Sequence, residues 1–202
     1  MRGRPPHIRD EDLLDAARDA FREDGHAATT AGIAKRAGVS EGILFYRYES
    51  KEALLAAVID RETQPPASLR QVALTAGTRP VADNLRHILE TVLESVFRAH
   101  PFIELAITSP SSHLIHKALF SKNRPAPERI VDLLVEYFEA EARLGRIRPV
   151  APALVARAVF GACFDHVRAC RLGVQGDDRS AFVAGLVDLL LHGVASSTPR
   201  EQ

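Results

Sequence analysis

The residues of this 202-residue sequence best suited to metal binding are histidines. His113 and His116 are three residues apart, so one face of a helix would carry both, and His100 is nearby in the sequence. A metal ion would need a third or fourth donor in compatible geometry. The sequence has no H-E-x-x-H or C-x-x-C motif and no glycine-rich phosphate loop. We therefore expect neither a bound metal nor a cofactor.

A short run of serines next to His113 suggests a nucleophile and its base. These are Ser109, Ser111 and Ser112. No G-x-S-x-G motif surrounds them, and no acidic residue is placed to orient the histidine. Capping of the following helix explains the serines. We expect that the protein is not an enzyme.

A second set of residues, at positions 30–48, has the chemistry of nucleic-acid recognition. Small and apolar residues first recur there at helical spacing. Gly38 follows and can supply the left-handed residue that reverses the chain. Ser40 then takes the N-cap position of a second short helix, in which Leu44 faces inward. This pattern predicts a helix-turn-helix, whose second helix enters the major groove of DNA.

The run from about residue 8 to residue 60 resembles the N-terminal DNA-binding domain of TetR-family transcriptional regulators. The resemblance rests on an AAR...F helix closed by Gly25, the pair Thr29 and Thr30, and the segments IAKRAGVS and SKEAL. It implies an all-α fold, with an N-terminal three-helix helix-turn-helix head and a C-terminal helical bundle that dimerises. It also implies that a threonine at the start of the second helix, and Lys51, contact the DNA backbone. Hydroxyls and free N–H groups at a helix N-terminus suit a phosphate.

The expected recognition helix offers several kinds of contact. Arg47 can clamp a phosphate or guanine O6 and N7, and Ile43 can touch thymine methyl groups. Gly42 lets the helix approach the groove closely. Glu41 either accepts from cytosine N4 or complements the positive end of its helix. Phe45 replaces a tyrosine common in the family, which removes one possible phosphate hydrogen bond. The full set of expected DNA contacts is Thr29, Thr30, Ser40, Glu41, Gly42, Ile43, Phe45, Tyr46, Arg47 and Lys51.

The overall charge gives no sign of a nucleic-acid partner, because 26 basic residues balance 26 acidic ones. Any DNA binding must come from local positive charge, in the motif and at the N-terminus, where Arg2, Arg4 and Arg9 cluster and residues 1–7 form an arm ahead of the first helix. That arm can follow phosphates or enter the minor groove, or it can be disordered.

The two cysteines fit a reducing compartment. Cys163 and Cys170 are seven residues apart on an expected helix, about 10 Å along its axis, which is too far for a disulfide. We interpret both as small buried hydrophobic residues. No apolar run reaches membrane-spanning length, and the N-terminus lacks the apolar core of a signal peptide. We therefore expect a cytoplasmic protein without a membrane partner.

Proline and glycine breaks divide the chain. The segment Gln64-Pro65-Pro66 ends or kinks a helix, which predicts a DNA-binding head at 7–67 with its helix-turn-helix at about 30–49. An effector-binding and dimerisation domain is expected at 68–195 and a frayed tail at 196–202. Apolar periodicity predicts a long helix from Pro80 that ends near Pro101, followed by a shorter one to about Thr108. Further helices are predicted over about 112–120, 126–144, 152–172 and 180–195.

The last two predicted helices are apolar over most of their circumference. Only Asp165 and His166 interrupt 158–167, and only Asp188 and His192 interrupt 182–194. A helix that is apolar all round must be covered on every side. A second copy of the same pair is the simplest cover, which predicts a two-fold homodimer built on a four-helix bundle. Complete burial within one subunit is the alternative.

An effector pocket is expected between the helices of the bundle, mostly apolar with a few polar groups. Each candidate side chain is individually explained by core packing, but together they suggest a small hydrophobic or aromatic effector. The candidates are Phe97, His100, Phe102, His113, His116, Phe120, Tyr137, Phe160 and Phe164. The resemblance implies a ligand-responsive transcriptional repressor that binds a near-palindromic operator. The alternative is a DNA-binding dimer without a small-molecule ligand, regulated by a protein partner.

Overall fold

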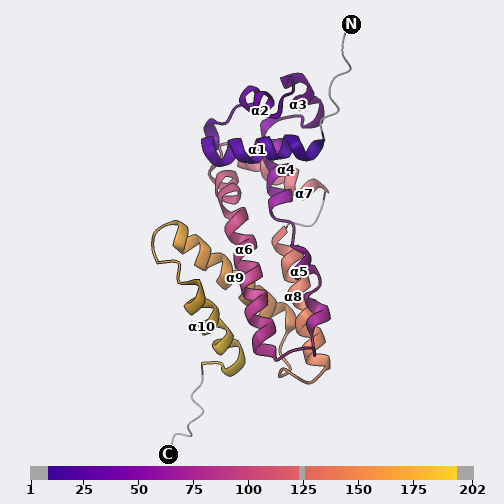
Figure 1. Cartoon of the computed structure of the whole chain (residues 1–202), viewed down its shortest axis with the longest axis vertical. Coiled ribbons are helices and arrows are strands. Elements are labelled where there is room, and N and C mark those ends of the chain that lie inside the picture. The colour runs from indigo at the N-terminus through magenta and orange to yellow at the C-terminus, as the bar shows by residue number, and fades with distance from the viewer. Residues whose placement is uncertain (1–8, 123–125, 195–202) are drawn as a thin grey trace, which may run out of the picture. The chain divides into compact units, whose positions relative to one another are not determined.

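The protein is described here by a computed structural model that covers residues 9–122 and 126–194, and those residues form helices and turns without a strand (Figure 1). The predicted all-α fold is confirmed. The chain divides into two compact units, residues 1–64 with 98–126, and residues 65–97 with 127–202. The chain passes from the first unit to the second at 64–65, and residues 98–126 belong to the first unit again. The functional domains expected at 7–67 and 68–195 stay predictions. The expected tail at 196–202 lies outside the described residues.

The first unit contains the segment expected to form the helix-turn-helix, together with two further helical segments. Its apolar core includes Leu13, Leu44, Leu54 and Phe102. Leu44 is fully buried, and it is the buried residue of the seven-residue helix Glu41–Arg47. That short helix is therefore stabilised by the packing of Leu44 and by its terminal hydrogen bonds. The elements are α1 (Asp10–Asp24), the short turn η1 (Gly25–Ala27), α2 (Thr30–Ala37), α3 (Glu41–Arg47), α4 (Lys51–Glu62), the end of α6 (Val81–Thr108) and α7 (Ser112–Lys122).

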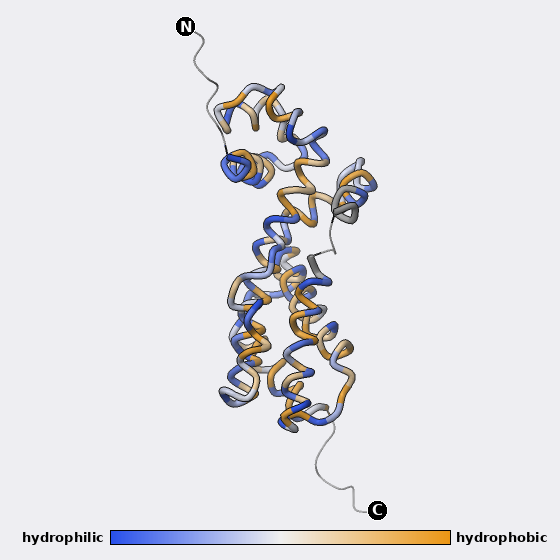
Figure 2. Tube along the Cα trace, turned by 90° about the vertical axis from the view of Figure 1, so that its right-hand side faces the viewer, coloured by the Kyte–Doolittle hydropathy of each residue, from blue (hydrophilic) through white to orange (hydrophobic). Residues whose placement is uncertain are grey.

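The second unit is a helical bundle with its own apolar core. Tyr137 is the largest of its fully buried side chains, and Leu89, Leu134 and Cys163 are buried in the same cluster. Along these helices hydrophobic residues recur between hydrophilic ones (Figure 2), as expected of helices that bury one face. The elements are α5 (Ala67–Arg70), the turn η2 (Val72–Thr75), the first part of α6, α8 (Ala126–Arg143), α9 (Pro152–Arg171) and α10 (Arg179–His192).

The predicted end of a helix near Pro101 is wrong, because α6 continues through Pro101 to Thr108. Proline has no N–H, so the carbonyl of Phe97, four residues earlier, loses its helical partner. Arg171 of α9 supplies the missing donor, with its Nη2 3.1 Å from the Phe97 carbonyl oxygen. The same guanidinium lies over the Phe97 ring, 4.1 Å from its centroid. A donor 74 residues away in the sequence thus satisfies the acceptor that the proline leaves open.

We expect Arg171→Ala to lower the free energy of unfolding by about 1–2 kcal/mol, because it removes both the hydrogen bond to Phe97 and the cation–π contact. Urea denaturation measures the change. Arg168→Ala is the control, since its guanidinium pairs with exposed Asp165 one turn earlier, and such a pair contributes about 0–1 kcal/mol. Equal losses in the two variants would contradict the role given to Arg171.

Candidate nucleic-acid interface

Hydroxyl side chains cap the three helices that surround the expected DNA surface. Thr29 Oγ1 accepts from the Gly32 N–H at 3.0 Å and caps α2. Ser40 Oγ accepts from the Ile43 N–H at 3.3 Å and caps α3. Ser50 Oγ caps α4 by accepting from the N–H of Ala53 at 3.1 Å. Each cap contributes about 1 kcal/mol, which matters for helices as short as α2 and α3. The predicted N-cap role of Ser40 is confirmed.

The turn between α2 and α3 depends on Gly38. Its φ of +70° and ψ of 27° are left-handed, a conformation that strains residues with a Cβ. A Cβ built on Gly38 would meet no atom within 4 Å, so the dihedral angles alone require glycine here. The N–H of Val39 then donates to the Ala34 carbonyl at 3.0 Å, which closes the end of α2. The predicted turn chemistry is confirmed.

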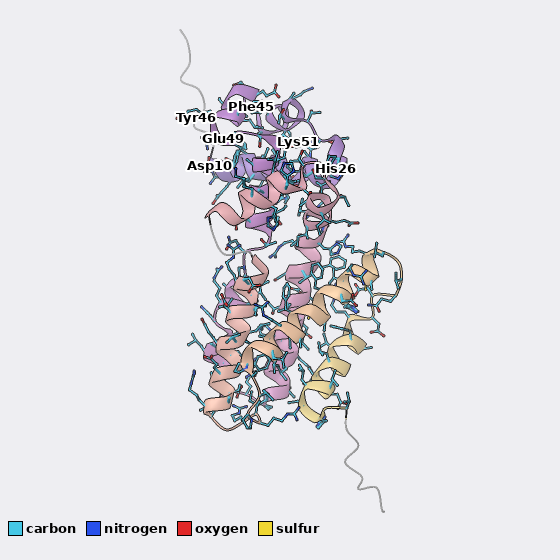
Figure 3. The ribbon with its side chains drawn as sticks, turned by 180° about the vertical axis from the view of Figure 1, so that it is seen from behind. Asp10, His26, Phe45, Tyr46, Glu49 and Lys51 are labelled. Carbon is cyan, nitrogen blue, oxygen red and sulfur yellow. The ribbon has the colours of Figure 1, made fainter. Side chains whose placement is uncertain are left out.

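The recognition helix α3 presents a largely exposed surface. Tyr46 is 90% exposed and Phe45 is 43% exposed; Figure 3 shows both at the surface of the head. Glu41 and Gly42 are exposed at the start of the helix, whereas Ile43 is half-buried. This exposed ring surface is therefore available to a partner, as the expected DNA contacts of Phe45 and Tyr46 require.

The charged groups around α3 already have partners within the head. The Arg47 guanidinium pairs with Asp10 of α1, and Lys51 Nζ donates to the His26 carbonyl at 2.7 Å. The Thr30 hydroxyl donates to Glu41, which links the start of α2 to the start of α3. Lys51 keeps further N–H donors for a phosphate, because an ammonium has three. A DNA phosphate near Arg47 would compete with the Asp10 carboxylate.

A second ion pair fixes α2 on α1. Arg36 of α2 donates to the Glu23 carboxylate, and this hydrogen bond lowers the pKa of Glu23 below its ordinary value. Both side chains are exposed, so the pair orients α2 more than it stabilises the fold.

Two of the expected effector contacts, His113 and His116, lie together on one open cavity of about 560 Å³ in the first unit. The apolar part of its lining belongs to α4, the end of α6 and α7. Ile59, Ile103 and Ile115 were not among the expected contacts, because helix packing and not the local sequence brings these three segments together. The lining residues are Ile59, Ile103, Ala106, Ile107, Ser112, His113, Ile115 and His116.

The remaining expected contacts lie elsewhere. His100 is buried near Glu104, and Phe102 belongs to the core of the head. Tyr137 is fully buried in the second unit, where burial raises the pKa of its hydroxyl. The rings of Phe160 and Phe164 stack with centroids 6.3 Å apart, and Phe97 contacts Arg171. The Phe120 side chain lies outside the described residues.

Short capped helices at a glycine turn, with exposed side chains on the second, define a helix-turn-helix DNA-binding protein. Residues 13–58 match bacterial regulatory proteins of the tetR family. The transcriptional regulator BetI of Escherichia coli strain UMN026 is 47% identical over 138 residues, 66% of this chain and 70% of that protein. BetI of Klebsiella pneumoniae is 49% identical over 53 residues, and there the chain spans 27% of the relative. The chain belongs to the TetR family of transcriptional regulators, and it is not an enzyme.

Solved structures show the same fold. A TetR-family regulator from Mesorhizobium loti superposes with a TM-score of 0.75 over 90% of this chain and 94% of that one, at 19% identity. The FadR repressor of Thermus thermophilus, solved in complex with lauroyl-CoA, has a TM-score of 0.63 and 25% identity over 96% of this chain and 99% of that one. Among the residues the structure describes, no helix is long and apolar enough to span a membrane.

Proposed function

We propose that the protein is a cytoplasmic repressor that binds a near-palindromic operator as a homodimer and leaves it when a small, largely hydrophobic effector binds. The surface of α3 is the observation that carries the DNA-binding part. Its exposed rings and the hydroxyls and cations around it match the groups that contact bases and phosphates. Two such helices in a two-fold dimer would read half-sites about one DNA turn apart.

The exposed faces of α9 and α10 support dimerisation. Leu154 of α9 is 70% exposed, and Leu189 and Leu191 of α10 are 44% and 39% exposed. Gly161 and Gly185 are exposed, and a Cβ on either would meet no atom within 4 Å. Apolar surface with small residues allows two helix pairs to approach closely, as in a four-helix bundle.

DNA binding is tested with Lys51→Ala and Arg47→Ala in salt titrations of operator affinity. Each phosphate contact contributes about 0.9 to the slope of log K against log salt. If each residue holds one phosphate in each head of a dimer, each variant should lower the slope by about 1.8 and weaken binding at every sequence. Arg148→Ala, an exposed cation of the second unit, is the control. Slopes that match wild type would remove Lys51 and Arg47 from the interface.

The cavity next to α4 supports control by a hydrophobic effector. Its occupant would touch Ile59 of α4 and Ile115 of α7, and α4 follows the recognition helix directly in the chain. An effector releases the protein from DNA only if it binds the arrangement of α4 that does not bind DNA more tightly than the arrangement that does. Such a difference in binding free energy is typically about 1–3 kcal/mol. Lauroyl-CoA, which the Thermus thermophilus FadR binds, is the first compound to test.

We expect lauroyl-CoA to raise the thermal midpoint and to weaken operator binding by about 5–150-fold. Coenzyme A without an acyl chain is the control ligand, because the cavity lining is mostly apolar. Ala106→Trp, which places an indole in the cavity, should abolish both effects while operator binding itself persists. Unchanged midpoints with lauroyl-CoA and with a panel of other lipophilic compounds would favour regulation by a protein partner instead.

A further inference from the structure

The end of α9 and the turn that leads toward α10 lie next to each other in the chain (Figure 1). Three side chains with metal-binding atoms come together there. His166 and Cys170 are one turn apart on α9, and Asp177 lies in the loop that follows. His166 Nε2 is 3.7 Å from Cys170 Sγ and 3.7 Å from Asp177 Oδ1. One ligand atom from each residue lies within 4.8 Å of the other two. The same imidazole nitrogen therefore faces both a thiol and a carboxylate.

The His166 ring is fixed in this orientation before any ion binds. It is buried, and it stacks on Phe182 of α10 with ring centroids 4.1 Å apart and an interplanar angle of 24°. Its other nitrogen, Nδ1, is 2.9 Å from the side-chain amide of Gln175. A ring held on its face and at Nδ1 keeps Nε2 directed toward Cys170 and Asp177.

The carboxylate is also positioned. Asp177 Oδ2 pairs with Arg179 at 3.2 Å, while Oδ1 is the oxygen nearest His166. Asp178, next in the chain, caps α10 by accepting from the Ala181 N–H at 3.0 Å. The loop therefore has one carboxylate that caps a helix and a second one directed at the imidazole.

We propose that this cluster binds Zn²⁺ through His166 Nε2, the Cys170 thiolate and one Asp177 oxygen. Tetrahedral zinc with Zn–S of about 2.3 Å and Zn–N of about 2.0–2.1 Å separates sulfur and nitrogen by about 3.6 Å, close to the 3.7 Å found here. Asp177 is exposed, so water can take the fourth position. Thiolate and imidazole favour zinc over the hard cations Mg²⁺ and Ca²⁺.

Binding requires two proton changes. Cys170 loses its thiol proton to solvent as the Zn–S bond forms, and His166 must carry its remaining proton on Nδ1. The Gln175 amide then turns so that its oxygen accepts the Nδ1–H, since amide orientation follows the hydrogen-bond network. The ion would join α9 to the loop that begins α10 and would stabilise this corner of the second unit.

The test uses the full chain, freed of metal by chelation and then titrated with Co²⁺ and Zn²⁺. We expect uptake of one Co²⁺ per chain with a thiolate-to-cobalt absorption band, displacement by Zn²⁺, and a rise in thermal midpoint with Zn²⁺ that Mg²⁺ does not reproduce. Replacing His166 would also remove a buried ring, so Cys170→Ala and Asp177→Asn test the ligands instead. Cys170→Ala should lose the band, and both variants should bind Zn²⁺ at least about tenfold more weakly.

Matched controls come from the same helix. Cys163→Ala removes a thiol that is fully buried in the core, and Asp165→Asn removes an exposed carboxylate paired with Arg168. Both should keep the absorption band and the Zn²⁺ affinity of wild type. The proposal fails if wild type takes up no stoichiometric Co²⁺, if the band persists in Cys170→Ala, or if Asp177→Asn and Asp165→Asn bind Zn²⁺ equally.

Discussion

Replacement of Tyr46 by alanine should lower operator affinity about tenfold or more and change the free energy of unfolding by less than about 0.5 kcal/mol. Tyr46 is 90% exposed on α3, so its ring makes little contribution to the core. A side chain that reads a base or holds a phosphate loses about 1–3 kcal/mol when it is removed. In a homodimer the change is made in both heads at once, which roughly doubles the loss in free energy.

Fluorescence anisotropy with operator DNA at fixed salt, combined with urea denaturation, separates the two quantities. Tyr46→Phe distinguishes the ring from the hydroxyl, because a phosphate hydrogen bond is lost in this variant while base contacts of the ring remain. Leu74→Ala is the control, since Leu74 is 77% exposed in the second unit. If Tyr46→Ala and Leu74→Ala bound operator equally well, this face of α3 would not contact DNA.

The head was the part of the fold most accessible from sequence, because its determinants are local. Ser40 caps a helix whose N–H groups are three residues away, and Gly38 adopts a conformation that its own lack of a Cβ permits. Leu44 is the one apolar position that the helix directs into the core. Such features depend on neighbours within one turn, which are visible in the printed sequence.

Features built from distant residues were not predictable in this way. Pro101 leaves the Phe97 carbonyl without its helical donor. The donor found in the structure is Arg171 of another helix, which the local sequence does not reveal. Arg47 has the charge to bind a phosphate, but its pairing with Asp10 of α1 could not be inferred from spacing.

The proposed zinc site contains residues of both kinds, some placed by local sequence and one placed by the fold. His166 and Cys170 stand at helical i, i+4 spacing and were open to detection, whereas Asp177 reaches them only because the loop after α9 turns back. The expected effector contacts also lie in different parts of the structure, because their positions depend on how distant helices pack. His113 and His116 share a helix and meet at one cavity, while Tyr137 is buried in the other core.

We expect Arg146→Ala to lower the free energy of unfolding by about 3–5 kcal/mol. This is the largest loss we expect from replacing a single partly exposed side chain. Glu141 is fully buried, and Arg146 Nε lies 3.3 Å from its Oε2. Asn84, which is neutral, also approaches this carboxylate, with its Nδ2 3.4 Å from Oε1. Arg146 also donates to the Arg79 carbonyl. Without the guanidinium, a buried negative charge would have no opposite charge to offset its desolvation.

Urea denaturation compares Arg146→Ala with Arg143→Ala. Arg143 pairs with Glu139 on the exposed surface at 3.8 Å, so Arg143→Ala should lower the free energy of unfolding by only about 0–1 kcal/mol. A second substitution tests the cause. Glu141→Gln in the Arg146→Ala background removes the uncompensated charge and keeps an acceptor for Asn84, so the double variant should be more stable than Arg146→Ala alone. A further loss on adding Glu141→Gln would mean that Arg146 acts through packing and the Arg79 hydrogen bond, and not through the buried charge.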